Sequence, residues 1–298
     1  MKLLYNYTAF GLNFQSEFEI PEFISFDNKP DVYLKLGKAP KDLTDKTNLG
    51  VRYQTNKNEF LLDVDKVARY YVKNGNEIIV DTKKKQVDKE IRLFLLGSAF
   101  GALFIQRGLL PIHGSAVKFG NRATMFTGQS GVGKSSIASF FMQKGFQVLT
   151  DDICVINENL ELNPGFPKMK LWHDMVENLN LKKENLSKVR DDMQKYHLPI
   201  ENQFYSKPIK PERLILIQTK NSTSFEIEEL SGIKKFNAIK NNTYRYRFVG
   251  GLEKRSEHFK ILNNLLPEIK VYRISRPQSP IMLKEFSDFL IKELNLDV

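Results

Sequence analysis

Apolar and polar residues alternate along much of the N-terminal third of the chain. Five short segments show this alternation, and turn-forming residues such as Asn74-Gly75 separate them. The segments are residues 14–20, 31–36, 59–64, 68–72 and 77–80. Because successive side chains of a strand point to opposite faces, each segment predicts a half-buried β-strand. We therefore expect a small, β-rich, antiparallel domain over residues 1–85, with a role in substrate docking or assembly.

A different pattern begins near residue 87. Residues 87–108 are predicted to form a helix that Pro111 terminates, and Gly97, Gly101 and Ala102 indicate close packing against a nucleotide-binding core. Beyond this helix, short apolar segments alternate with amphipathic ones. The predicted strands are 112–117, 123–127, 146–156, 212–218, 224–230 and 271–275, and the predicted helices are 135–144, 231–241, 255–267 and 280–294. This alternation predicts an α/β domain over residues 86–298.

Residues 173–205 interrupt the alternation. The segment is rich in charged residues, and its pattern is mostly that of helices. We expect either a mobile lid or a substrate-binding insertion here, and the sequence leaves both alternatives open.

The strongest chemical signal follows the strand predicted at 123–127. Residues 128–135 read Gly-Gln-Ser-Gly-Val-Gly-Lys-Ser, the full G-x-x-x-x-G-K-[ST] pattern of a phosphate-binding loop, or P-loop. Its glycines permit a tight turn whose backbone N–H groups point at a polyphosphate, and the helix that follows adds a partial positive charge. Lys134 can reach the β and γ phosphates, and the Ser135 hydroxyl can hold Mg²⁺. The sequence therefore predicts binding of ATP or GTP with Mg²⁺ through Gly128, Gln129, Ser130, Gly131, Val132, Gly133, Lys134, Ser135 and Ser136.

Two adjacent carboxylates form the second signal. The apolar segment that begins at Phe146 reaches Asp151 and Asp152 and then resumes as Ile-Cys-Val-Ile. Charge flanked by apolar strand residues is costly to bury unless it has a role. A carboxylate on the strand beside a P-loop commonly supports Mg²⁺, and a second one can accept the proton of an attacking hydroxyl. The pair therefore favours phosphoryl transfer over nucleotide binding alone.

Three basic residues are further candidates. His113 begins a strand that is predicted to pair with residues 123–127, so its side chain is expected near the entry of the loop, in either a structural or a catalytic role. Lys168 and Lys170 alternate with apolar residues and therefore face one side of an extended segment. They could clamp phosphate or an acidic peptide, or they could belong to a solvated edge strand.

Composition excludes some classes of partner. The 298-residue chain has a formal net charge of +10, but its lysines are scattered and do not alternate with aromatic residues, so nucleic-acid binding is not expected. The longest apolar segment, residues 93–105, is too short to cross a bilayer, and no N-terminal signal is visible. Cys154 is the single cysteine, which excludes a disulfide framework. We therefore expect a cytoplasmic protein with no nucleic-acid or membrane partner.

Three motifs together resemble one enzyme family. They are Leu-Pro-Ile-His-Gly-Ser-Ala-Val at 110–117, the P-loop at 128–135, and Lys-Gly-Phe-Gln-Val-Leu-Thr-Asp-Asp at 144–152. In order and spacing they resemble the catalytic domain of bacterial HPr kinase/phosphorylase. The β-rich N-terminal part and the Pro-Gly-Phe-Pro-Lys-Met-Lys-Leu-Trp segment at 164–172 are similar to HPr-kinase-like proteins of this length. The resemblance implies an α/β fold with a P-loop core of the HPr kinase/phosphoenolpyruvate carboxykinase-like type and a small β-rich N-terminal domain.

The resemblance also implies a role for each candidate residue. Lys134 would hold the transferred phosphoryl group, and Ser135 would ligate Mg²⁺. Asp152 would be the base that deprotonates an acceptor serine. Asp151 would support the metal or orient Asp152, and His113 would be hydrogen-bonded near the phosphoryl group or Asp152.

The function predicted first is an ATP- and Mg²⁺-dependent kinase that phosphorylates a serine of a peptide or small protein. The resemblance includes proteins that act on ribosomally made peptide precursors, among them those of lasso peptides, and it is compatible with a homo-oligomer. Two alternatives remain: HPr kinase/phosphorylase acting on HPr, and a nucleotide-dependent binding or assembly module that transfers no phosphate. Arg245 and Arg247 are candidates for the family's later catalytic arginine.

Overall fold

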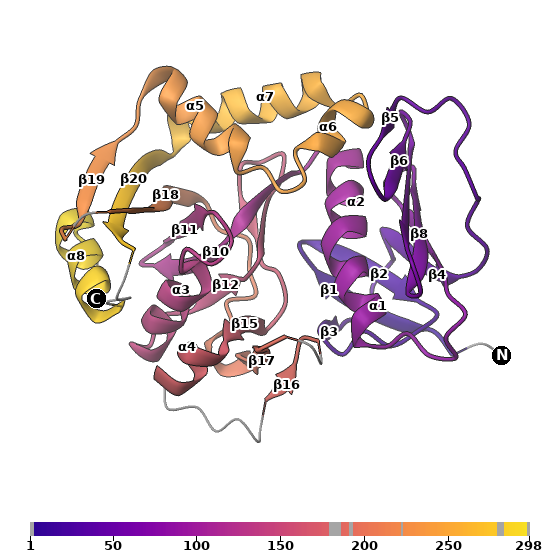
Figure 1. Ribbon diagram of the computed structural model, residues 1–298, viewed down its shortest axis with the longest axis horizontal. Coiled ribbons are helices and arrows are strands. Elements are labelled where there is room, and N and C mark those ends of the chain that lie inside the picture. Colours follow the sequence, from indigo (N-terminus) through magenta and orange to yellow (C-terminus); the bar gives the residue numbers. More distant parts are fainter. Residues whose placement is uncertain (1–2, 179–185, 191–192, 222, 279–282, 297–298) are drawn as a thin grey trace. The chain divides into compact units, whose positions relative to one another are not determined.

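The computed structural model describes residues 3–178, 186–190, 193–221, 223–278 and 283–296, and it divides into two compact units (Figure 1). The first unit comprises Met1–Pro111 and Tyr244–Ile261, and the second comprises Ile112–Thr243 and Leu262–Val298. Several β-sheets and interspersed helices make the fold mixed α/β.

The described part of the first unit contains a nine-stranded sheet in the order β3-β1-β2-β4-β9-β8-β7-β6-β5. The predicted strands at 31–36, 59–64, 68–72 and 77–80 are confirmed to within one residue, whereas the strand predicted at 14–20 begins earlier and ends at residue 16. The sheet is not purely antiparallel as predicted, because β4 pairs in parallel with both β2 and β9. The strands are β1 (Tyr5–Ala9), β2 (Leu12–Ser16), β3 (Ile24–Ser25), β4 (Val32–Leu36), β5 (Asn48–Leu49), β6 (Tyr53–Thr55), β7 (Glu59–Val64), β8 (Ala68–Lys73) and β9 (Glu77–Asp81).

The helix predicted at 87–108 consists of α1 (Lys89–Phe94), a π-helical turn (Leu95–Ala99) and α2 (Phe100–Gln106). Phe100 stacks on Phe14 with ring centroids 5.2 Å apart, and Phe104 meets Phe10 at 5.0 Å. The helix therefore buries its apolar face against strands of the first unit. Its glycines, expected to pack on a nucleotide-binding core, instead lie against Tyr244, which belongs to the same unit.

Residues far along the chain complete the first unit. Phe248 of α6 (Arg247–Gly251) packs against the rings of Tyr53 and Phe60, with centroids 4.7 Å and 4.6 Å apart. The Thr47 hydroxyl donates a hydrogen bond to the Gly251 carbonyl oxygen. The chain therefore passes from one unit to the other after residues 111, 243 and 261.

The main sheet of the second unit has the order β14-β13-β10-β11-β18-β20-β19, and β12 also pairs with β10. The predicted antiparallel pairing of the strands before the P-loop is confirmed, because Gly114 of β10 lies opposite Thr127 of β11. β11 and β18 are parallel, as are β18 and β20, so the P-loop leaves a central strand. The strands are β10 (Leu110–Phe119), β11 (Arg122–Gly128), β12 (Val148–Thr150), β13 (Ile153–Ile156), β14 (Leu162–Asn163), β18 (Pro211–Lys220), β19 (Glu226–Glu229) and β20 (Lys270–Pro277).

Helices and a hydrophobic core complete the second unit. Its core contains Phe126, Phe141, Ile217 and Leu290, which come from strands of the main sheet and from α3 and α8. The helices are α3 (Lys134–Gln143), α4 (His173–Asn178), α5 (Gly232–Asn241) and α8 (Leu283–Leu294), while α7 (Arg255–Leu265) continues from the first unit into the second.

A separate three-stranded sheet has the order β15-β17-β16, formed by β15 (Lys168–Trp172), β16 (Ser187–Lys188) and β17 (Lys195–Pro199). The helical pattern predicted for 173–205 is wrong for β16 and β17. Buried Tyr196 and Leu198 alternate there with Lys195 and His197, which is the period of a strand. Residues 179–185 and 191–192 of the predicted insertion lie outside the described residues.

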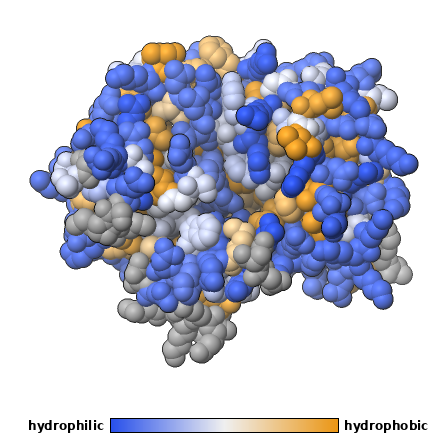
Figure 2. Space-filling view, in the orientation of Figure 1, coloured by the Kyte–Doolittle hydropathy of each residue, from blue (hydrophilic) through white to orange (hydrophobic). Residues whose placement is uncertain are grey.

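Hydrophilic residues predominate on the face drawn in Figure 2, where hydrophobic residues form scattered patches. Within the described ranges, no helix has the length and apolar character needed to cross a membrane. The largest apolar side chains therefore lie in the cores of the two units, with a few exposed exceptions such as Leu49 and Val51.

Candidate active site

A glycine-rich loop joins β11 to α3. β11 ends at Gly128, and α3 begins at Lys134 with Gly133 as its N-cap. Gly128, Gly131 and Gly133 have φ angles of 138°, 84° and 105°, in a region that other residues rarely adopt. A Cβ atom on Gly128 would also lie 2.3 Å from the Ile217 carbonyl oxygen. The loop therefore depends on glycine, and it places backbone N–H groups beside the positive end of α3.

The other predicted loop residues follow the same turn. Gln129 and Ser130 are exposed at its tip, whereas Val132 is buried and donates its N–H to the Gln129 carbonyl oxygen at 3.3 Å. Ser135 and Ser136 are half-buried in the first turn of α3. The predicted nucleotide-binding residues therefore form one continuous segment from strand to helix.

Lys134 turns back onto its own loop. Its buried Nζ donates hydrogen bonds to the carbonyl oxygens of Gly128 and Gln129, at 3.0 Å and 2.9 Å. Burial lowers the pKa of Lys134, because the ammonium group loses hydration. A polyphosphate in the loop would offer charged acceptors in place of neutral carbonyls, and such bonds are stronger. The lysine is therefore suited to binding an anion.

Three donors hold the buried carboxylate of Asp151. Its Oδ1 accepts hydrogen bonds from the hydroxyls of Ser135, at 2.8 Å, and of Ser115 on β10, at 2.6 Å. Its Oδ2 accepts the backbone N–H of Lys170 at 2.8 Å. Because the hydroxyl of a P-loop serine is an Mg²⁺ ligand, Asp151 lies where a carboxylate can support that metal.

The neighbouring carboxylate of Asp152 has different partners. Its Oδ2 lies 2.7 Å from the Lys170 Nζ, and its Oδ1 lies 3.6 Å from the His113 Nδ1. Burial alone would raise the pKa of Asp152, but the charge and hydrogen bond of Lys170 outweigh it and hold the pKa well below its usual range. Asp152 also has a φ of 80°, an uncommon conformation for a residue with a Cβ atom. The carboxylate is therefore ionised at neutral pH and held by a strained backbone.

His113 lies on β10 beside Asp152. Its Nδ1 is 3.0 Å from the Asp152 carbonyl oxygen, which can only accept a hydrogen bond, so Nδ1 carries the proton. Burial lowers the pKa of His113, and the charge of Lys134 lowers it further. The ring is therefore neutral at pH 7, with Nε2 as an acceptor. The structure thus brings His113, Lys134, Asp151 and Asp152 together within the second unit.

The sequence analysis did not identify two residues that take part in the site. Ser115 donates a hydrogen bond to Asp151. It follows His113 by two residues on one strand, so the two side chains lie on the same face. This spacing could have identified Ser115 from the sequence. Arg276 of β20 is buried, and its Nε and Nη2 donate to the Val132 carbonyl oxygen at 3.2 Å and 3.1 Å. Because 144 residues separate this pair, no local pattern indicates the contact.

The donor set fits a nucleotide with Mg²⁺. The described residues contain no group of three or more histidine, cysteine, aspartate or glutamate side chains that could hold a metal by themselves. Mg²⁺ commonly uses one or two protein ligands together with phosphate oxygens and water. Ser135 and Asp151 would supply the protein ligands, while Lys134 and the loop amides would hold the phosphates.

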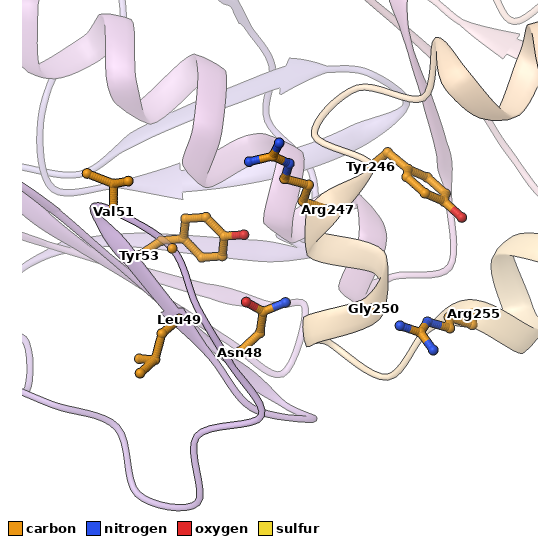
Figure 3. A pocket seen from close by; sticks show the side chains of 9 residues that line it. Asn48, Leu49, Val51, Tyr53, Tyr246, Arg247, Gly250 and Arg255 are labelled. Carbon is orange, nitrogen blue, oxygen red and sulfur yellow. The ribbon is translucent and has the colours of Figure 1, made fainter.

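The candidate arginines belong to the first unit. Arg247 is exposed and lines an open cavity of about 520 Å³ together with Arg255 (Figure 3). Asn48, Leu49, Val51 and Tyr53 approach this cavity from β5, β6 and the turn between them. Arg245 lies over the ring of Tyr244, with its Cζ 5.2 Å from the ring centroid.

Comparisons with known proteins give matches by structure and none by sequence. No protein-family model matches the chain, and no curated protein matches its sequence. The solved structure of the Hpr(Ser) kinase/phosphatase from Coxiella burnetii aligns with 62% of this chain and 95% of its own, at 10% sequence identity and a TM-score of 0.32. A likeness at this score carries no weight on function.

Proposed function

We propose that this protein is an ATP- and Mg²⁺-dependent kinase that transfers the γ-phosphoryl group to a serine hydroxyl of a peptide or small protein. The observation that carries the proposal is that two adjacent carboxylates have different bonding partners. Asp151 is bonded to the P-loop Ser135, whereas Asp152 faces His113 and Lys170. One carboxylate is therefore available for the metal and the other for the acceptor.

The residues of the chain would perform two tasks. The loop amides and Lys134 would hold the phosphates and neutralise the charge that develops during transfer. Asp152 would accept the proton of the serine hydroxyl as the serine oxygen forms its bond to the γ-phosphorus. The bond from that phosphorus to the bridging oxygen breaks, and ADP leaves with the electron pair. Mg²⁺, when bound, supplies further positive charge to the phosphate oxygens.

The low pKa of Asp152 is compatible with this role. The carboxylate that faces the acceptor must be ionised, and Lys170 keeps it so at neutral pH. A weak base suffices when the transition state is loose, because the serine proton is lost late. His113 would fix the segment around Asp152 through its bond to the Asp152 carbonyl oxygen.

A substitution of the proposed base tests the function. Asp152→Asn should retain ATP binding and lower phosphate transfer by about 10²–10⁴-fold, the usual contribution of general-base catalysis. Lys134→Ala should weaken both activities. Transfer is measured as the mass gain of one phosphate on serine-containing peptides and, in a separate assay, on HPr.

Three outcomes separate the alternatives. Full transfer by Asp152→Asn would remove the assignment of the base. Phosphorylation of HPr in preference to peptides would favour the HPr kinase/phosphorylase alternative. ATP binding without phosphate on any acceptor would favour a nucleotide-dependent assembly module.

A further inference from the structure

Figure 1 labels β15, β17 and β16, the three strands of a separate sheet. The two faces of this sheet differ in the residues that they carry. Met169, Leu171, Tyr196 and Leu198 lie on one face and are buried in the core of the second unit. Because side chains alternate along a strand, the residues between them lie on the other face. This second face, the basic face, consists of Lys168, Lys170 and Trp172 from β15 and Lys195 and His197 from β17.

The basic face concentrates positive charge. The register places Lys170 opposite His197 and Trp172 opposite Lys195, whose Nζ lies 5.5 Å from the Trp172 ring centroid. None of the three strands contains an aspartate or glutamate. Like charges on one face of a sheet repel each other. Because basic side chains predominate on this face, it should attract an anionic ligand.

The basic face continues into the candidate active site. The Nζ of Lys170 lies 2.7 Å from the carboxylate of Asp152, and the backbone N–H of Lys170 bonds to Asp151. The charge of Lys195 acts on both Asp152 and Lys134. A peptide that crossed this face would therefore reach the proposed base within the second unit.

We infer that the basic face docks the acceptor peptide and selects segments in which aspartate or glutamate flanks the serine. The inference rests on the proposed kinase function, since it names the class of acceptor. Carboxylates of the peptide would pair with Lys168 and Lys195, beside the Trp172 ring, which is 40% exposed.

A single-stranded nucleic acid fits this face less well. Platforms for single strands stack successive bases on several open aromatic rings. Among its described side chains, the basic face has one large aromatic ring, that of Trp172, and Lys195 already lies over it. Charge complementarity without a row of open rings therefore favours an acidic peptide.

The single tryptophan of the chain provides a selective probe, because it lies on the basic face. The full-length protein is titrated with a synthetic peptide in which glutamates flank one serine, and with a matched peptide in which glutamines replace them. Tryptophan emission is followed in both titrations. The acidic peptide should bind roughly tenfold more tightly than the neutral one, and its affinity should fall as salt is added.

A double substitution tests which residues confer the preference. Lys168→Gln with Lys195→Gln should bring the two affinities to within about twofold of each other, because both charges that face the peptide are removed. Lys284→Gln is the control, since Lys284 is an exposed lysine on α8 that pairs with Asp288. This control should keep the preference and should bind ATP as the unaltered protein does.

Other outcomes overturn the inference. Equal affinity for the two peptides would contradict it, as would a double variant that loses ATP affinity but keeps the peptide preference. Displacement of the acidic peptide by oligouridylate RNA at similar concentration would favour a nucleic-acid ligand instead. Phosphate transfer is measured separately by mass. Charge-selective binding without transfer would contradict the kinase, whereas transfer without charge selectivity would contradict only the docking surface.

Discussion

The two units of the molecule hold their positive charges in different ways. Arg247 and Arg255 of the first unit line an open cavity and are exposed to water. Lys134 and Arg276 of the second unit are buried, and the recorded hydrogen bonds of both go to backbone carbonyl oxygens. An exposed guanidinium keeps its hydration, whereas a buried cation has lost it and needs compensation. Burial, more than the mere presence of charge, therefore marks where an anion is expected to bind.

Lys170→Met should give the largest loss of stability, because it leaves the Asp152 carboxylate without its cation. Both groups are partly buried, with side chains 16% and 30% exposed. The free energy of unfolding in urea at neutral pH should fall by about 2 kcal/mol, less than for a fully buried pair. Lys284→Met on the surface of α8 should change it by less than about 0.5 kcal/mol.

The loss of stability in Lys170→Met should depend on pH. Lys170 lowers the pKa of Asp152 in the folded state, so the pair contributes stability above the unfolded pKa of about 3.9. That contribution disappears as pH falls through the folded pKa. The difference between the two proteins should therefore shrink below about pH 4. A constant difference would show that Lys170 acts through packing instead.

Arg276→Met should weaken ATP binding, because the loop loses two donors to the Val132 carbonyl oxygen and a nearby positive charge. We expect roughly tenfold weaker binding by calorimetry, or about 1.4 kcal/mol. Arg273→Met on the same strand is the matched control, since Arg273 pairs with Glu228. Equal affinities for the two variants would contradict a role for Arg276 in fixing the loop.

His113 should make stability depend on pH near neutrality. Its pKa is lowered by burial, so the unfolded chain takes up the proton first as pH falls below about 6.5. Stability should decline from there down to the folded pKa, by at most about 1.4 kcal/mol per pH unit. Urea unfolding of His113→Gln should show a shallower decline over this range, and an unchanged slope would assign the dependence to another group.

Arg255→Gln should have the smallest effect. The side chain is exposed at the cavity of the first unit, so its removal should change the free energy of unfolding by less than about 0.5 kcal/mol. ATP affinity should be unchanged within twofold. A loss of ATP affinity comparable to that of Arg276→Met would break the contrast between exposed and buried cations.

Local patterns predicted most of the individual elements. The strand at 59–64 matches β7 residue for residue, and the strand and helix that flank the P-loop motif form as β11 and α3. These elements follow from alternation and from glycine positions, which are properties of neighbouring residues. The roles of the site residues stay predictions until they are tested.

Local sequence patterns did not predict the contacts between segments that lie far apart in the chain. The contact of Arg276 with Val132 and the return of residues 244–261 to the first unit join segments far apart in sequence. The strand β17 was also missed, because its period-two alternation is only five residues long and lies in a segment rich in charged residues. Packing between distant segments determines such features, and a single sequence does not show which distant segments come into contact.

The return of residues 244–261 has a consequence for synthesis on the ribosome. The aromatic rings of Tyr53 and Phe60 pack against Phe248, which is synthesised much later. At about 5–20 residues per second, translation from residue 111 to residue 244 lasts roughly 7 to 27 seconds. We expect the nascent first unit to expose this surface during that interval, so that chaperones can bind it. A fragment that ends before residue 244 would expose the same surface permanently.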